Sequence, residues 1–211
     1  MEYVDVLDCS GRSTGETITR EKAHRSGAWH GAFHCLIVYE RNRRPCALFQ
    51  KRSRKKLIAP EKFDVSVGGH YAAGEDAANA GPREIREELG LAVPFSGLVS
   101  VGRRVYTTCS APGIIEQEFQ DVFLYPCVGG PGKLELQSEE VEAVVELDVD
   151  SGISLFSGGT LSATAMLVSP GKGAAVALSA EDFVFCIDNY YLKLLLLARR
   201  YFKGERGLLV I

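Results

Sequence analysis

The sequence predicts an α/β protein in which strands of a mixed sheet surround one central helix. Three observations support this prediction. Short apolar strands separated by turns dominate residues 33–67, helical spacing takes over at about 76–89, and further strand-like segments follow. Alternation marks a strand, whereas apolar residues three and four apart mark a helix face. The 211 residues suit one domain with additions, so we expect a single domain over 1–211 with a core at about 30–148.

The N-terminal segment is expected to form a β-hairpin followed by a helix. Residues 3–8 and 13–18 alternate like strands, and Cys9-Ser10-Gly11 supplies the turn between them. The helix should begin after Thr19, whose hydroxyl can cap it, although Lys22 stands where a capping box would have glutamate.

Core strands are expected before and after the central helix in the sequence. Three lie before it, at 33–39, 46–50 and 63–67, and three after it, at 98–106, 118–126 and 141–148. Inside the helix, Gly81-Pro82 is unfavourable, because an interior proline costs about 3 kcal/mol and removes one backbone hydrogen bond. We therefore expect a kink or a late helix start there.

Residues 149–211 are expected to add a C-terminal extension to the core. The segment 149–179 is rich in Gly, Ser and Ala, with short strands expected at 163–168 and 174–178. A long amphipathic helix is predicted over about 180–203. Its apolar stripe consists of Phe183, Ile187, Tyr190, Tyr191, Leu194 and Leu197. We expect this stripe to pack in the core or in a homodimer contact rather than to bind a cofactor.

Composition narrows the classes of function. A net charge of −3 argues against a nucleic-acid polymer as partner, and no apolar run reaches the roughly 18 residues that span a membrane. The first residues lack the basic and apolar segments of a secretion signal, so we expect a cytoplasmic location. The six cysteines lack the paired spacing of zinc sites and are expected to be reduced and mostly buried.

The central helix carries an acidic stripe. On a helix, Glu84, Glu87 and Glu88 fall within about 100° of one another. The apolar face, about 120° away, consists of Ala78, Ile85 and Leu89. Crowded carboxylates repel, and a bound divalent cation reverses the sign of that interaction. Oxygen ligands suit Mg²⁺ or Mn²⁺, and a metal that binds phosphate oxygens and activates water fits diphosphate cleavage.

The neighbouring residues have mechanical uses at such a site. Gly69 allows close approach of the loop to the metal, and Gly90 can end the helix in the left-handed conformation. Arg83 can pair with a carboxylate such as Glu75 and hold the cluster in register. A solvated acidic helix face is the alternative for a lone Glu-x-x-Glu-Glu, but it does not account for all these positions together.

Residues 69–91 match the pattern G-x5-E-x7-R-E-U-x-E-E-x-G-U, where U is aliphatic, and thus resemble the Nudix box. The resemblance implies a Nudix α/β/α sandwich with a mixed central sheet, here with an N-terminal hairpin and an extra C-terminal helix. It implies a Mg²⁺-dependent (or Mn²⁺-dependent) hydrolase of a small nucleoside-diphosphate-like or other organic diphosphate. Glu84, Glu87 and Glu88 would bind metal together with Gly69, Arg83 would be catalytic, and the general base would be one of these glutamates or a downstream one.

Residues 3–148 are also similar to isopentenyl diphosphate isomerases and their hydrolase relatives. The similar segments include 4–8, 19–24 and 29–33. In those isomerases three histidines and two glutamates hold a metal. The matching positions here are His24, His30, His70, Glu116 and Glu118. The isomerases also place an acid/base cysteine just before the Gly-His pair and have an eroded Nudix box. This chain has Gly68 there and an intact box, so hydrolysis is favoured over isomerisation.

A basic loop at residues 51–56 precedes the box. Its sequence is Lys-Arg-Ser-Arg-Lys-Lys, and in the related proteins this loop contacts the diphosphate. We expect Arg52, Lys55 and Lys56 to bind substrate phosphates, since guanidinium and ammonium groups suit phosphate oxygens. A solvated loop is the alternative. A non-catalytic ligand-binding module is a further alternative, which loss of a box glutamate would have favoured.

Overall fold

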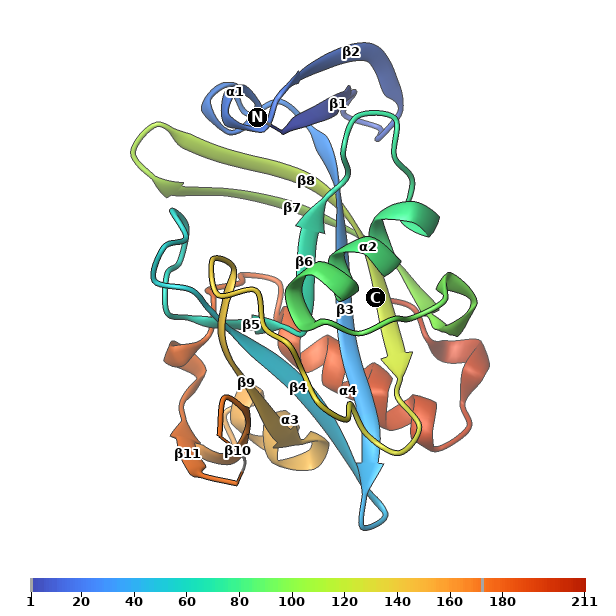
Figure 1. The fold of residues 1–211 in the computed structure, drawn as a ribbon, viewed down its shortest axis with the longest axis vertical. Coiled ribbons are helices and arrows are strands. Elements are labelled where there is room, and N and C mark those ends of the chain that lie inside the picture. Colours follow the sequence, from blue (N-terminus) through green and yellow to red (C-terminus); the bar gives the residue numbers. More distant parts are fainter. Residues whose placement is uncertain (1, 172) are drawn as a thin grey trace.

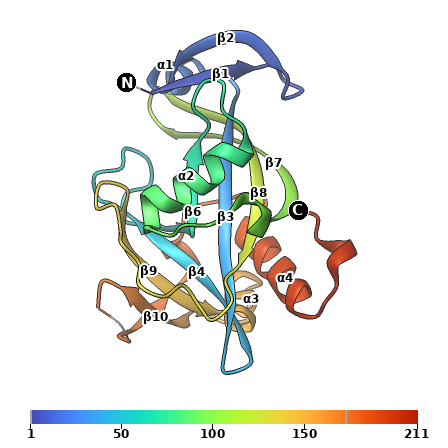
Figure 2. The same ribbon diagram turned by 45° about the vertical axis from the view of Figure 1, so that its right-hand side comes forward.

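In the computed structural model, which describes residues 2–171 and 173–211, a nine-stranded sheet lies between two helical layers (Figure 1). Helix α2 (Ala77–Leu89) packs on one face, while α3 (Val149–Phe156) and α4 (Tyr190–Phe202) pack on the other. Figure 2 shows α2 and α4 on opposite sides of β3. The predicted α/β/α sandwich is therefore confirmed.

The strand order is that of a mixed sheet. In space the strands run β11 (Ala175–Leu178), β10 (Ala163–Ser169), β9 (Val141–Asp148), β4 (Arg44–Arg52), β3 (His30–Arg41), β8 (Ile114–Pro126) and β7 (Val99–Ala111). In addition, β5 (Phe63–Val65) pairs with β4, and β6 (Val67–His70) pairs with β3. The β3–β8 pair is parallel, and the other pairs of described strands are antiparallel.

The strand predicted at 63–67 is two strands, because the sheet divides at Ser66. The start of β3 pairs with β6, whereas its end pairs with β4. At the division the buried Ser66 hydroxyl accepts a hydrogen bond from Ile37 N at 2.8 Å and donates one to Leu48 O at 2.5 Å. This side chain satisfies backbone groups that the diverging strands leave without partners. Beyond Ser66, β6 follows β3 while β5 stays with β4.

The predicted N-terminal hairpin and helix are present. β1 (Tyr3–Leu7) and β2 (Ser13–Thr19) pair antiparallel, and α1 (Arg20–Ser26) follows. Thr19 caps α1 by accepting a hydrogen bond from Lys22 N at 3.2 Å, as predicted. In Figure 1 this unit lies at the top, beside the β7–β8 hairpin. It brings α1 close to the beginning of β3.

Helix α2 differs from expectation in two details. It runs as one continuous helix from Ala77 to Leu89, with Pro82 inside it, so the alternative of a late start is wrong. Asp76 caps the helix by accepting a hydrogen bond from Asn79 N at 3.0 Å, which fixes the earlier start. Ala78 is exposed instead of packed. Ile85 and Leu89, by contrast, are fully buried against the sheet as expected.

Helix α3 was not predicted. No element was expected at these residues of the Gly- and Ser-rich segment, yet Asp148 caps the helix by accepting a hydrogen bond from Ser151 N at 2.9 Å. Gly152 packs closely on α4, since a Cβ atom there would lie 2.7 Å from Leu195 Cδ1 and would force that side chain to move. Contact between the two helices therefore explains a glycine that disfavours a helix in isolation.

The last helix begins ten residues later than predicted, at Tyr190 rather than about residue 180. Asn189 has a left-handed backbone conformation (φ 54°), which separates α4 from the segment before it. Within that segment Phe183 is buried but Ile187 is 80% exposed. The stripe on α4 packs in the core, and none of the helices described is long and apolar enough to cross a membrane.

The expectation for the cysteines holds in part. Three are buried, Cys35, Cys46 and Cys127, while Cys9 and Cys109 are exposed. Cys186 is partly buried. The prediction that most of them are buried therefore applies to half of the six.

Candidate functional site

A cavity of about 530 Å³ is lined by residues of β4, β6, β8 and α2. It gathers most of the residues expected at the site. Among those lining it are Arg52, Lys55, Lys56, Gly69, His70, Arg83, Glu84, Glu87, Glu88, Glu116, Glu118 and His24. Of the predicted site residues, all of which the structure describes, His30 is the one that does not line the cavity, and its side chain is fully buried behind it.

The acidic stripe of α2 is divided between buried and exposed side chains. Glu84 and Glu88 are 8% and 4% exposed, whereas Glu87 is exposed. Glu88 accepts a hydrogen bond from Gln50 Nε2 on β4 at 3.1 Å. Burial, followed by the neighbouring Glu84 carboxylate, raises the pKa of Glu88 to about 8. A divalent cation between these carboxylates would remove the cost of ionising both, so they suit Mg²⁺ or Mn²⁺.

Arg83 holds the acidic residues together. It donates to both carboxylate oxygens of Glu75, at 2.9 and 2.7 Å, as predicted. It also donates to Glu84 at 2.8 Å and to Glu87 at 3.1 Å. Gly69 lies directly against this cluster, because a Cβ atom there would be only 2.1 Å from the carboxyl carbon of Glu84. A larger residue would displace that glutamate.

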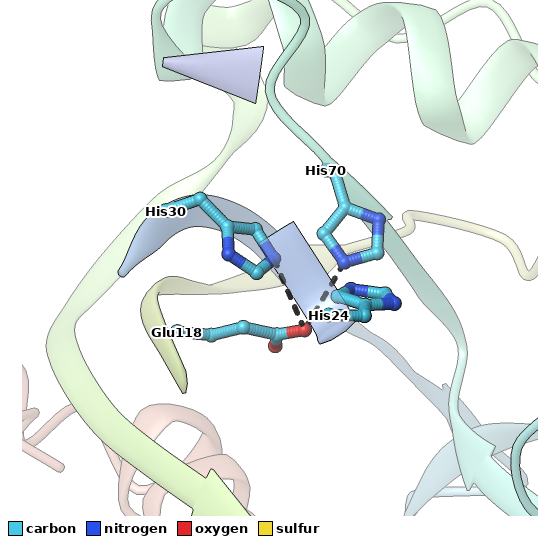
Figure 3. Close-up of side chains that lie close together, drawn as sticks. All are labelled: His24, His30, His70 and Glu118. Atoms are coloured by element: carbon cyan, nitrogen blue, oxygen red, sulfur yellow. Dashed lines mark hydrogen bonds and ion pairs between the residues drawn. The ribbon is translucent and has the colours of Figure 1, made fainter. Parts of the chain in front are cut away.

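Three histidines and one glutamate form a second group at the edge of the cavity, with His30 buried behind it (Figure 3). The candidate ligand atoms of His24, His30, His70 and Glu118 all lie within 4.8 Å of one another. Strand register explains the arrangement, since His30 is the parallel partner of Glu118. His70 is the partner of Ala32, which is two residues from His30 and so faces the same side. Helix α1 supplies His24.

This group fits a metal ion. The Nε2 atoms of His24 and His30 are buried and lack a hydrogen-bond partner in the described parts of the chain. His30 Nδ1 donates to Ala28 O at 2.8 Å, so its Nε2 lone pair points into the cluster. Burial, followed by the neighbouring histidines, lowers the pKa of His24 to about 4 and leaves a neutral imidazole. Three nitrogens and a carboxylate suit a transition metal better than Mg²⁺.

The fifth predicted ligand lies apart from this group. Glu116 lines the cavity and is 8% exposed, but it is not among the four residues whose ligand atoms lie within 4.8 Å. Glu116 and Glu118 are two residues apart on β8 and share a face, as expected. The structure therefore gathers four of the five predicted ligands.

The predicted phosphate-binding residues already have acidic neighbours. Lys55 lies 2.5 Å from Glu139 Oε1, and Lys56 forms an ion pair with Glu140. Arg52 lines the same wall of the cavity and is mostly buried. An entering diphosphate would have to compete with Glu139 and Glu140 for the two ammonium groups.

Sequence reasoning missed three polar residues of the site. Gln50 contacts Glu88, as described above, and Gln120 contacts Glu118 at 2.7 Å. Arg104 contacts Gln120 at 2.8 Å. The alternation of β8 could have indicated Gln120, which follows Glu118 by two residues. No local pattern indicates Gln50 or Arg104, because their partners are distant in sequence.

Comparison with known proteins agrees with this geometry. A family model described as NUDIX domain matches residues 28–154, which include the box and α2. The chain belongs to the Nudix family. It is 32% identical over 149 residues to an uncharacterised Nudix hydrolase of Clostridium acetobutylicum, covering 71% of each chain. This Nudix chain is therefore an enzyme of a hydrolase family that acts on pyrophosphate bonds.

Two further comparisons bear on the branch and on the fold. The Nudix chain is 32% identical over 128 residues to an isopentenyl-diphosphate Delta-isomerase of Mycolicibacterium vanbaalenii, covering 61% of this chain and 68% of that one. A solved structure of a Deinococcus radiodurans protein matches with a TM-score of 0.59 and 17% identity, covering 94% of this chain and 98% of that one. The second match shows a shared fold alone.

Proposed function

We propose that this Nudix hydrolase uses Mg²⁺ or Mn²⁺ to split the diphosphate bond of a small organic diphosphate. One observation carries the proposal most strongly. Three glutamates of the box (Glu84, Glu87 and Glu88) and three cationic residues of the basic loop (Arg52, Lys55 and Lys56) line one cavity. A metal-binding wall and a phosphate-binding wall around a single space suit phosphoryl chemistry, which depends mainly on positioning and charge stabilisation.

The acidic wall would hold the metal and activate water. Glu84, Glu87 and Glu88 are the proposed ligands, and a bound divalent ion would supply charge neutralisation and a water of lowered pKa. One of these glutamates, or Glu118 in the same cavity, would take the proton of the attacking water. Arg83 would keep the carboxylates in place through its four hydrogen bonds to glutamates.

The basic wall would hold the substrate. Arg52, Lys55 and Lys56 would bind oxygens of the diphosphate, with the two lysines leaving Glu139 and Glu140. Phosphate oxygens are stronger partners for ammonium groups than part-exposed carboxylates, because they carry more charge. The products would be a phosphorylated organic group and phosphate, or two phosphorylated halves.

The histidine cluster would hold a second cation. The Nε2 atoms of His24 and His30 are buried and have no hydrogen-bond partner within the described residues, which supports this part of the proposal. His70 and Glu118 would complete the first set of ligands, and Glu116 would require movement to join them. Metal binding here would position substrate next to the glutamates of α2.

Isomerisation of isopentenyl diphosphate is the second candidate. The histidine cluster and the similarity to an isomerase favour it, whereas Gly68 has no side chain to act as acid. Cys186 does line the cavity, but burial raises the pKa of its thiol to about 11. A non-catalytic binding module is a third candidate, and the complete set of box glutamates argues against it.

A screen for phosphate release over organic diphosphates with Mg²⁺ tests the proposal. Glu87→Gln and Glu88→Gln should lose at least 100-fold in kcat, whereas Glu16→Gln, at an exposed site outside the cavity wall, should retain full activity. A wild type as inactive as the two variants on every compound would favour the binding module. Conversion of isopentenyl to dimethylallyl diphosphate would favour the isomerase.

Two other properties remain predictions of the sequence. A cytoplasmic location is expected, and so is the absence of a nucleic-acid polymer among the partners. A homodimer is a further prediction, which light scattering after gel filtration can test.

A further inference from the structure

The carboxylate of Glu118 is hydrogen-bonded by Gln120, a residue of the same strand. Gln120 Nε2 donates to Glu118 Oε2 at 2.7 Å, and the two side chains belong to residues only 2% and 5% exposed. The other oxygen, Oε1, lies 3.0 Å from His70 Nε2 and 3.8 Å from His30 Nε2. The Gln120 amide therefore engages one oxygen. The other oxygen faces the imidazoles of His30 and His70 (Figure 3).

Arg104 fixes the orientation of that amide. Its Nη1 donates to Gln120 Oε1 at 2.8 Å, and a guanidinium can only donate hydrogen bonds. The amide oxygen of Gln120 must then face Arg104, and the amide nitrogen must face Glu118. Rotation of the amide by 180° would place two donors together and two acceptors together, which is costly in a buried network.

Arg104 is itself anchored by the segment that begins α4. It is 7% exposed and donates to both carboxylate oxygens of Asp188, at 2.9 and 2.7 Å. Its guanidinium carbon lies 3.9 Å from the ring centroid of Tyr190 and 4.6 Å from that of Tyr106. Paired hydrogen bonds and stacking on two rings leave this side chain little freedom. Asp188 and Tyr190 lie outside the part matched by the family model.

We propose that Gln120 and Arg104 are positioning residues, which orient the Glu118 carboxylate so that only its Oε1 atom is available to bind the cation. Asp188 and Tyr190, at the start of α4, in turn fix the position of Arg104. The inference rests on the proposed cation site at the histidine cluster. Hydrogen bonds to a ligating carboxylate orient it, and removing such a partner typically costs about 10- to 100-fold in metal affinity. The C-terminal extension then has a function in the site rather than in the core alone.

Co²⁺ binding to the whole chain tests this inference. Calorimetry and visible absorption are measured in excess Mg²⁺, which competes for the carboxylates of α2 but poorly for imidazole nitrogens. Gln120→Met keeps the length of the side chain but removes both hydrogen bonds. It should weaken Co²⁺ binding about 10- to 100-fold and shift the absorption bands. Gln117→Met, the same change on the opposite face of β8, should alter neither.

A second variant covers the case in which Gln120→Met does not fold. Gln120→Glu has the same shape and keeps an acceptor for Arg104, but it presents an acceptor to Glu118, so the Co²⁺ bands should shift. Wild-type affinity and bands in the folded variants would overturn the inference. A wild type that binds no Co²⁺ yet releases phosphate would overturn the histidine site and this inference with it. That result would leave the proposed hydrolysis intact.

Discussion

Replacement of Glu88 by glutamine should stabilise the metal-free protein at alkaline pH. The Glu88 carboxyl is 4% exposed and lies near Glu84, and its pKa is raised to about 8, first by burial and then by that neighbour. Glutamine has the same shape, and its amide oxygen can still accept the hydrogen bond from Gln50. The variant removes a buried charge without opening a cavity.

The sign and size of the effect follow from proton linkage. Below about pH 4.5, the ordinary pKa of a glutamate side chain, the carboxyl is protonated in both the folded and the unfolded chain. Between pH 4.5 and about 8 the unfolded carboxyl loses its proton first, so the free energy of unfolding of the wild type falls as pH rises. Each pKa unit corresponds to about 1.4 kcal/mol. The rise in the pKa of Glu88 therefore lowers the free energy of unfolding of the wild type by at most roughly 5 kcal/mol above pH 8.

Urea denaturation in a metal chelator at pH 5 and pH 8.5 measures this difference. Glu88→Gln should exceed the wild type in free energy of unfolding by about 1 kcal/mol or less at pH 5 and by several kcal/mol at pH 8.5. Glu87→Gln is the matched control on the same helix. Its side chain is exposed, so its effect should be about 0.5 kcal/mol and similar at both pH values.

Magnesium should reverse the advantage of the variant. At pH 8.5 a cation bound to the ionised carboxylates stabilises the wild type by mass action, and the glutamine variant should gain less. An equal stability difference at both pH values would refute the argument from burial. Equal stabilisation of wild type and variant by millimolar Mg²⁺ would refute a metal site that includes Glu88.

Three further outcomes are expected. Gly69→Ala places a Cβ 2.1 Å from the Glu84 carboxyl carbon, so phosphate release should fall about 100-fold while circular dichroism stays unchanged; full activity would contradict the close packing. Arg83→Lys loses the paired bonds to Glu75, so urea denaturation should show a loss of about 1–3 kcal/mol, and wild-type stability would contradict it. Lys56→Met should raise KM for a diphosphate with little change in kcat. An unchanged KM with a lowered kcat would exclude binding of the ground-state phosphate by Lys56.

Much of the fold could be predicted because its signals are local. The Thr19 cap and the buried pair Ile85 and Leu89 depend on residues within one or two helical turns. The elements that sequence reasoning missed depend on distant contacts. Gly152 in α3 packs on Leu195, and the division of the strand at Ser66 depends on Ile37 and Leu48.

The sequence by itself determined the acidic stripe of α2, because fixed spacing on a helix fixes which side chains share a face. The candidate ligands His24, His30, His70, Glu116 and Glu118 came from the resemblance to isopentenyl diphosphate isomerases. Only the tertiary structure decided how those candidates are grouped. Strand register set His30 beside Glu118, and Glu116 remained outside the cluster. The connection from Asp188 through Arg104 and Gln120 spans residues up to 84 apart in sequence. Such contacts arise from packing of distant segments, on which local spacing carries no information.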